Sequence, residues 1–378
     1  MKNIHGGNIY KTAASQGVSP QDIVDFSANI NPVGLSAKGQ AAILSHLDEI
    51  IHYPDPNNMD LLNIASTVLH VPDEYILFGN GAAQLLYALM EVKGLQQVIV
   101  PAPGFSEYAL AAKAQDLNVR SYPLTLALEP QVHFTVPYEL LRQYLSEAAV
   151  KGQRSLVCLG NPNNPDGSLQ TVHEVLALAT LANESNSLLL IDESFIEFTN
   201  ESHSLRPYLA EYDNLLVLHS LTKFYAIPGL RLGALLGHPQ VLTNIQQHIP
   251  AWSVNHLAAQ YGRAALQDEV YRQKSRAVVA REKEWLYGAI KAFPFIKAVA
   301  PSVNFMLLHW EPNSPSLQDL MNFLETKHVL IRNCEAYEGL GTGWFRIAVK
   351  DRTNNQLLIS YVKEFAYAHN LFSSSWSD

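Results

Sequence analysis

The segment SLTKFYAIPGLRLG, residues 220–233, directly follows the apolar run LLVLH, which has the length and composition of a buried β-strand. It places Lys223 at the end of that strand and Arg231 eight residues later. Ser220 and Thr222 add two hydroxyl groups. Because a lysine amine condenses with an aldehyde, and hydroxyl and guanidinium groups bind phosphate, the segment predicts a Schiff-base lysine beside a phosphate site. A single lysine in a loop is more often an ordinary surface residue.

Apolar runs with the length of buried strands recur through the middle of the chain. They lie at residues 97–101, 155–159, 188–191 and 215–219. Amphipathic segments such as residues 171–183 separate them, and this alternation predicts an α/β fold with a mostly parallel central sheet covered by helices. Polar residues gather directly after the strands, at 161–167, 192–193 and 220–223. Ligands bind at the carboxyl ends of strands in such sheets, so we expect the site there.

The two ends of the chain have different patterns. Residues 239–293 are typical of long helices, and the sequence from residue 298 onward predicts a smaller α+β unit with strands near 304–309 and 344–349. The first 35 residues are rich in Gly, Asn and Pro, and we expect an ordered arm there rather than a helix. The predicted organisation is an arm at 1–35, a large domain at 36–240, and linking helices with a small C-terminal domain at 241–378.

Composition excludes several classes of protein. The 378 residues are 48% hydrophobic and 16% charged, which is typical of a globular chain, and a net charge of −9 argues against a nucleic-acid-binding protein. Two cysteines, Cys158 and Cys334, form no CxxC pair, so we predict neither disulfides nor a metal site. The apolar runs are too short to span a bilayer, and the N-terminus lacks a signal core. We expect a soluble, cytoplasmic protein.

Asp192 ends the apolar strand LLLID. A buried carboxylate without a partner is energetically costly, so this position requires one. The simpler explanation is a helix N-cap, which is a common role for aspartate. The functional explanation is a counter-ion for a pyridinium nitrogen, as found beside pyridoxal phosphate.

Three further motifs are ambiguous when each is taken alone. The segment GNGAAQLLY runs through Gly81 and Ala82 into a helix, and offers backbone N–H groups to an anion or simply makes a tight turn. In NPNNPDG, Asn164 is able to donate a hydrogen bond to a ring oxygen, although the prolines also predict a turn. In PAPGFSEY, Phe105 is either a ring-stacking residue or part of the core. Their common position at strand ends favours one shared site.

Together these residues resemble the fold-type I pyridoxal-phosphate enzymes, the aspartate aminotransferase superfamily, over nearly the whole chain. The resemblance implies pyridoxal 5′-phosphate as cofactor, with Lys223 as the covalent attachment point and Asp192 facing the pyridine nitrogen. The other implied cofactor contacts are Gly81, Ala82, Phe105, Asn164, Ser220, Thr222 and Arg231. In the histidinol-phosphate branch, the tyrosine of a YPDP motif reaches the neighbouring subunit's cofactor. Tyr53 matches it here, which implies a homodimer with shared sites.

Within this branch, HGGN followed by DFSANINP resembles the L-threonine-O-3-phosphate decarboxylases of cobalamin nucleotide-loop synthesis. Phe195, in DESF, supports that resemblance, because histidinol-phosphate aminotransferases usually carry a tyrosine there. The implied substrate contacts are His5, Gly6, Asn29, Asn164, Arg332 and Arg346. Two arginines suit the bidentate recognition of a carboxylate and a phosphate.

The resemblance therefore implies a carbon–carbon lyase that converts L-threonine O-3-phosphate to (R)-1-aminopropan-2-yl phosphate and CO2. Serine phosphate is a second possible substrate, because one methyl group contributes only about 1–3 kcal/mol to discrimination. Histidinol-phosphate aminotransferase is the alternative function. A non-catalytic ligand-binding protein of the same fold is a third alternative, but it predicts loss of Lys223 or Asp192, and both residues are present.

Overall fold

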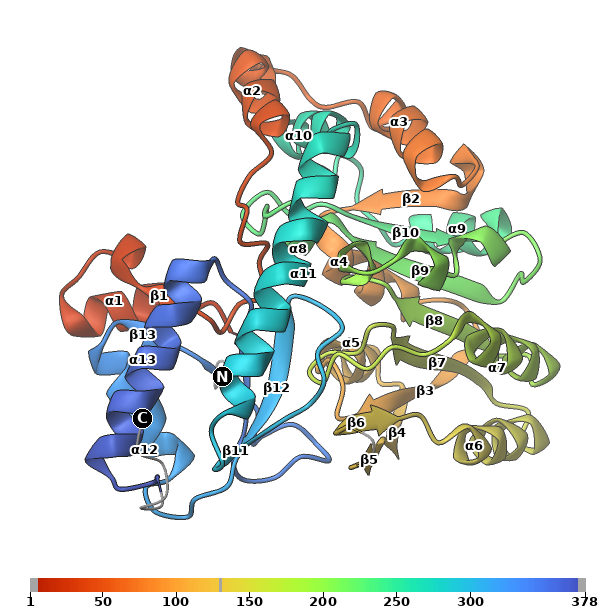
Figure 1. The fold of residues 1–378 in the computed structure, drawn as a ribbon. Helices are drawn as coiled ribbons and strands as arrows, with labels where there is room; N and C mark the ends of the chain where they lie inside the picture. Colours follow the sequence, from red (N-terminus) through yellow and green to blue (C-terminus); the bar gives the residue numbers. More distant parts are fainter. Residues whose placement is uncertain (1–5, 129–130, 373–378) are drawn as a thin grey trace.

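A seven-stranded sheet forms the larger part of the computed structural model, which describes residues 6–128 and 131–372 (Figure 1). Its strands are β2 (Ile76–Gly79), β10 (Gly233–Gly237), β9 (Leu215–Ser220), β8 (Leu188–Asp192), β7 (Arg154–Gly160), β3 (Leu95–Ala102) and β4 (Asn118–Pro123), in spatial order. Strands β9, β8, β7, β3 and β4 are parallel, and β10 is antiparallel to both of its neighbours. The predicted mostly parallel sheet is confirmed.

Helices cover both faces of this sheet, which explains why its strands are apolar without alternation. Successive side chains of β8 point to opposite faces: Leu189 belongs to one core cluster and Leu190 to the other. The first cluster includes residues of α6 (Tyr138–Val150) and α7 (Val172–Glu184), and the second includes residues of α4 (Gly81–Leu89) and α5 (Glu107–Ala114). The sheet is therefore rigid up to the carboxyl ends of its strands.

A smaller antiparallel sheet lies beside the large one (Figure 1). Its strands are β11 (Ile296–Ala298), β12 (Phe305–Trp310), β15 (Trp344–Ala348) and β14 (Arg332–Asn333), in spatial order, and it packs with α12 (Leu317–Thr326) and α13 (Arg352–Ala368). The predicted smaller α+β unit is thus confirmed. The predicted helical stretch comprises α9 (Pro239–Gln246), α10 (His256–Leu266) and the long α11 (Glu269–Lys291), which runs between the two sheets in Figure 1.

The expectation of an arm without a helix is wrong, because α1 (Ile9–Gln16) is helical. Asn8 caps its first turn by accepting a hydrogen bond from the Lys11 backbone, and Gly17 ends it with φ of 67°. The arm then forms β1 (Val24–Asp25), which pairs in parallel with β13 (Val329–Leu330). The arm and β13 therefore form a separate two-stranded sheet, which joins the N-terminal arm to the C-terminal part of the chain.

The remaining helices lie mainly above the large sheet in Figure 1. They include α2 (Ala37–Ser45) and α3 (Met59–Leu69), both in contact with α10, and the one-turn helix α8 (Leu221–Phe224). Within the described residues, no helix is both long enough and apolar enough to cross a membrane.

Candidate active site

A cavity of about 420 Å³ lies between the carboxyl ends of β7, β8 and β9, the arm, and the small sheet. It brings together twelve of the residues predicted for the site. They are Gly6, Asn29, Ala82, Phe105, Asn164, Asp192, Ser220, Thr222, Lys223, Arg231, Arg332 and Arg346. These residues are distant in sequence, so their convergence on one cavity is the main structural evidence for a functional site.

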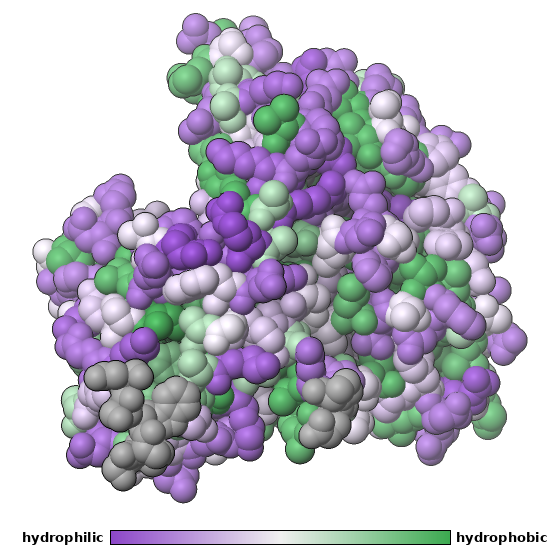
Figure 2. All heavy atoms as spheres, viewed as in Figure 1, coloured by the Kyte–Doolittle hydropathy of each residue, from purple (hydrophilic) through white to green (hydrophobic). Residues whose placement is uncertain are grey.

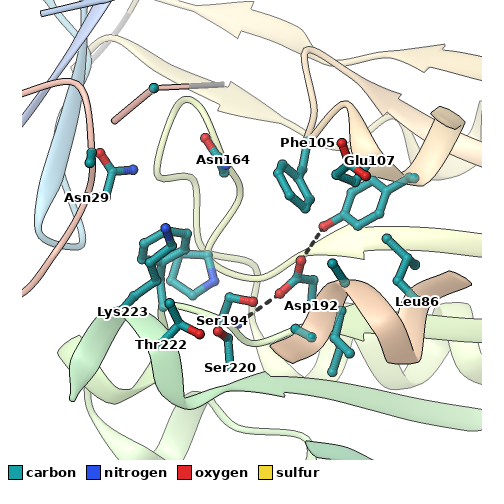
Figure 3. Close-up of a pocket in the computed structure, with 18 of the residues that line it drawn as sticks. Asn29, Leu86, Phe105, Glu107, Asn164, Asp192, Ser194, Ser220, Thr222 and Lys223 are labelled. Carbon is teal, nitrogen blue, oxygen red and sulfur yellow. Dashed lines mark hydrogen bonds between the residues drawn. The ribbon is translucent and has the colours of Figure 1, made fainter. Parts of the chain in front are cut away.

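Asp192 stands at the end of β8 with its carboxylate held from two directions (Figure 3). Tyr108 donates a hydrogen bond from its hydroxyl to Asp192 Oδ2 over 2.8 Å, and the Ser194 backbone N–H donates to Oδ1 over 2.9 Å. Burial raises the pKa of Asp192, and these two hydrogen bonds oppose that shift. The two hydrogen bonds hold the carboxylate in place and stabilise part of its negative charge. The carboxylate is therefore positioned to pair with a buried cation.

Lys223 follows β9 directly, in the single turn of α8, and its side chain points into the cavity (Figure 3). Burial lowers its pKa to about 8, and the positive charges of Arg346 and Arg231 act in the same direction, while Asp25 opposes them. The backbone N–H of Asn31, in the arm, donates to the Lys223 carbonyl over 3.1 Å. A substantial fraction of this amine is therefore neutral near pH 8, and a neutral amine is the nucleophilic form.

A cradle for an anion forms where α4 begins beside Arg231. Gly81 has φ of +76°, and a Cβ there would lie 2.7 Å from Arg231 Nη2. Gly233 is equally constrained, because its Cβ would lie 2.5 Å from the Ala82 backbone nitrogen. The glycines let the guanidinium and the helix N-terminus approach each other closely. Ser220 and Thr222 add hydroxyl groups at the same end of the cavity, a donor set typical of phosphate sites.

Arg332 and Arg346 are directly paired residues on the adjacent strands β14 and β15, and both line the cavity. Arg346 donates from Nη1 to Asn164 Oδ1 and from Nη2 to the Ser27 carbonyl, the latter over 3.2 Å. Its guanidinium lies 5.3 Å from the centre of the Phe305 ring. Two guanidinium groups that line one cavity attract anionic groups such as carboxylate and phosphate. The pair therefore favours an anionic ligand.

Asn164, Phe105 and Asn29 also line the cavity, and they lie above Lys223 in the view of Figure 3. Because Asn164 accepts from Arg346 with its oxygen, its amide nitrogen is left to donate into the cavity. Phe105 contacts Tyr108 edge-on at 5.6 Å between ring centres and lines the cavity rather than only the core. Asn29 is buried, and its Oδ1 has no hydrogen-bond partner among the described residues. A buried acceptor of this kind fits a ligand that donates.

Two of the predicted residues that the structure describes are not among those lining this cavity. Gly81 lies beneath Arg231 rather than on the surface of the cavity. Tyr53 is 80% exposed, outside the cavity, and its ring packs at a tilt against Trp252, with 4.7 Å between the ring centres. His5 lies outside the described residues.

Sequence reasoning missed Tyr108, Ser194, Ser27 and Tyr337, all of which line the cavity. Tyr108 lies in the first turn of α5, and Phe105 precedes that helix. No spacing rule in the sequence indicated Tyr108. Ser194 donates to Asp192 from its backbone, and its side chain also lowers the pKa of that carboxyl group; no motif in the sequence indicated this role.

The model of the family described as aminotransferase class I and II matches residues 21–362. The chain belongs to the class I and II aminotransferase family. Members of this family use pyridoxal 5′-phosphate, and the chain is a pyridoxal-phosphate enzyme. Among its relatives, threonine-phosphate decarboxylase of Salmonella typhimurium is 33% identical over 95% of each chain. The adenosylcobalamin biosynthesis bifunctional protein CobDQ of Leptospira interrogans is also 33% identical, over 96% of this chain and 41% of that longer protein.

Solved structures of this family share the fold. The histidinol-phosphate aminotransferase of Clostridium acetobutylicum has a TM-score of 0.82 and 26% identity, covering 92% of this chain and all of that one. The L-threonine-O-3-phosphate decarboxylase of Porphyromonas gingivalis has a TM-score of 0.77 and 24% identity, covering 91% of this chain and all of that one. The fold is thus common to aminotransferases and decarboxylases, and specificity must come from the site.

The residues of the cavity fit the cofactor of this aminotransferase family. A lysine amine of lowered pKa suits the aldehyde, and a buried carboxylate suits the pyridine nitrogen. The cradle of Gly81 and Arg231, in which the missing Cβ of the glycine lets the guanidinium approach the start of α4, suits the phosphate. Each functional group of the cofactor therefore has a chemically matched partner in the chain.

Proposed function

We propose that the chain catalyses the decarboxylation of L-threonine O-3-phosphate to (R)-1-aminopropan-2-yl phosphate and CO2, as part of cobalamin nucleotide-loop synthesis. The observation that carries the proposal is the pair Arg332 and Arg346, two guanidinium groups on adjacent strands facing the same cavity as Lys223. A substrate with both a carboxylate and a phosphate compensates both charges. The 33% identity to a threonine-phosphate decarboxylase over 95% of each chain supports the same substrate.

When bound, pyridoxal phosphate supplies an electron sink for the bond at the substrate's Cα that stands perpendicular to its ring. The chain's contribution is orientation, because Arg332 and Arg346 fix the anionic groups and so decide which bond takes that position. Holding the carboxylate there favours loss of CO2, whereas holding the hydrogen there favours transamination. A difference of about 1.4 kcal/mol between the two orientations changes the product ratio tenfold.

Lys223 and Asp192 have separate roles in this proposal. Asp192, held by Tyr108 and Ser194, provides the negative charge that keeps a cation at the end of β8. Lys223 holds the cofactor in the resting enzyme and afterwards returns a proton to Cα, a role that suits an amine with a pKa of about 8.

Phe195 favours decarboxylation over the alternative, histidinol-phosphate aminotransferase. Its ring contacts Phe305 edge-on at 4.9 Å, and Phe305 in turn lies under Arg346. A phenylalanine presents no hydroxyl to the cavity at the position where the aminotransferases usually carry a tyrosine. The aminotransferase remains the second candidate because the fold is shared at a TM-score of 0.82.

We also propose a homodimer in which Tyr53 reaches the neighbouring subunit's site. Exposed apolar side chains gather around it, and Figure 2 shows some of them in green where α2 projects. They are Leu44, Leu47, Ile50, Ile51, Met59 and Trp252. Exposed apolar side chains that lie together on a protein surface are typical of an interface. A second copy of the chain would cover it and bring Tyr53 toward a cavity other than its own.

Product identification tests the proposed function directly. The purified protein, loaded with pyridoxal phosphate, is incubated separately with threonine phosphate, serine phosphate and histidinol phosphate, each with and without 2-oxoglutarate. The proposal predicts CO2 and an amino alcohol phosphate from threonine phosphate without any acceptor. Formation of glutamate from histidinol phosphate, with no CO2 from either phospho-amino acid, would establish the aminotransferase instead.

A further inference from the structure

Ser27 lines the cavity at the point where the start of the N-terminal arm, Gly6 and Gly7, contacts a later part of the same arm. Its hydroxyl accepts a hydrogen bond from the Gly7 backbone N–H over 2.8 Å and donates one to Asp25 Oδ1 over 2.6 Å. Because an ionised carboxylate only accepts hydrogen bonds, the hydroxyl proton points to Asp25 and a lone pair faces Gly7. Gly6 packs against the same residue so closely that a Cβ there would lie 2.3 Å from the Ser27 carbonyl oxygen.

The backbone around Ser27 is fixed on both sides, to β13 and to β15 of the small sheet. The Phe26 N–H donates to the Leu330 carbonyl, and the Phe26 carbonyl accepts from the Ala348 N–H, each over 2.8 Å. The Ser27 carbonyl accepts from Arg346 Nη2 over 3.2 Å. One buried residue, 6% exposed, therefore contacts both the arm and one of the paired arginines. A substitution at Ser27 would therefore alter the positions of both the arm and Arg346.

We infer that Ser27, oriented by Asp25, is a positioning residue that holds the N-terminal arm and Arg346 in one arrangement around the substrate's anionic groups. The inference rests on the proposed function, because that function assigns Gly6 and Arg346 to substrate binding. The hydroxyl of Ser27 is already engaged by Asp25 and Gly7, so it takes no direct part in bond breaking. Its removal should therefore weaken substrate binding more than it slows the chemical step.

The first test compares Ser27→Ala with the wild-type holoenzyme. We expect KM for the phospho-amino acid to rise about tenfold, equivalent to about 1.4 kcal/mol, with kcat changed less than about threefold. We also expect faster amide hydrogen exchange in the peptide containing Gly7, measured without substrate. Ser15→Ala is the matched control, because Ser15 lies in the same arm but, among the residues that the structure describes, its hydroxyl bonds only to the Thr12 carbonyl within α1. Ser15→Ala should change neither KM nor the rate of hydrogen exchange at Gly7.

A second pair of variants separates the orienting role of Asp25 from the hydroxyl itself. Asp25→Asn keeps an oxygen that accepts from Ser27 and should retain a nearly normal KM, whereas Asp25→Ala removes it and should raise KM. Equal KM values in these two variants would overturn the inference, even where Ser27→Ala does not fold. Unchanged KM and unchanged Gly7 exchange in Ser27→Ala would overturn it as well.

The two measurements, KM and hydrogen exchange at Gly7, also distinguish a failure of this inference from a failure of the proposed function. A wild-type holoenzyme that turns over no phospho-amino acid would contradict the proposed function. Hydrogen exchange at Gly7 needs no substrate, so in that case it still decides whether Ser27 holds the arm.

Discussion

The hydroxyl of Tyr108 donates a hydrogen bond to Asp192 over 2.8 Å, and both residues are buried. This bond links the first turn of α5 to the end of β8. Burial alone would raise the pKa of Asp192, and the bond from Tyr108 opposes that rise. The hydrogen bonds from Ser194 and Tyr108 together favour the ionised form of the carboxylate at the end of β8.

Replacing Tyr108 with phenylalanine should lower kcat about tenfold, because a hydrogen bond to a charged group contributes roughly 1.5–3 kcal/mol. Steady-state kinetics should show little change in KM. Tyr122→Phe is the matched control: its hydroxyl is equally buried but donates to the Cys158 carbonyl over 2.9 Å, away from Asp192. Equal kcat values in the two variants would show that Tyr108 has no special role.

Replacing Gly81 with alanine should weaken cofactor binding by tenfold or more. The new Cβ would lie 2.7 Å from Arg231 Nη2 and would displace the guanidinium from the anion cradle. Gly94→Ala provides the control, since Gly94 has a similar φ of +85° but nothing within 4 Å of its Cβ. Both variants carry backbone strain of about 1–2 kcal/mol, so only Gly81→Ala should change the dissociation constant measured by equilibrium dialysis.

The rate of cofactor attachment to the apoenzyme should depend on pH through Lys223. The pKa of this amine is lowered from 10.5 to about 8, and only its neutral form reacts. Lowering the pH below 8 protonates the amine and should slow attachment, while raising the pH above 8 should bring the rate to a plateau. Stopped-flow absorbance of the bound cofactor measures the midpoint. A midpoint near 10.5 would mean that Lys223 is not the desolvated amine described here.

Introducing a charge into the apolar patch near Tyr53 should separate the proposed dimer. Ile51 is 81% exposed there, and Ile51→Glu should yield a monomer with most of its activity lost. Val150→Glu is the control, because Val150 is 89% exposed at the end of α6, in a different part of the chain. Light scattering after size-exclusion chromatography gives the mass of each. A wild-type monomer with full activity would contradict the shared site.

Most of the large sheet was predictable because its strands are apolar on both faces. The run at residues 188–191 could only be buried, and β8 differs from that prediction by one residue. The helix α1 was missed although Asn8 and Gly17 are ordinary capping residues, because the surrounding Gly and Asn suggested irregular backbone. The Gly- and Asn-rich composition of this segment therefore obscured the capping signal of the helix.

The site was less predictable where contacts join distant segments. Tyr108 and Asp192 are 84 residues apart, and no pattern in either motif indicates that they meet. The direct pairing of Arg332 with Arg346 depends on the register of β14 against β15, which only the folded sheet defines. The residue types were visible in the sequence, but their partners were not.

The central claim, that Lys223 carries pyridoxal phosphate, is tested most directly by locating the covalent linkage. The holoenzyme is reduced with sodium borohydride, digested, and the modified peptide is identified by mass spectrometry. The account predicts that the modification lies on Lys223 and disappears in Lys223→Ala, together with turnover. Modification of another lysine in the wild-type enzyme, or full activity in Lys223→Ala, would contradict it.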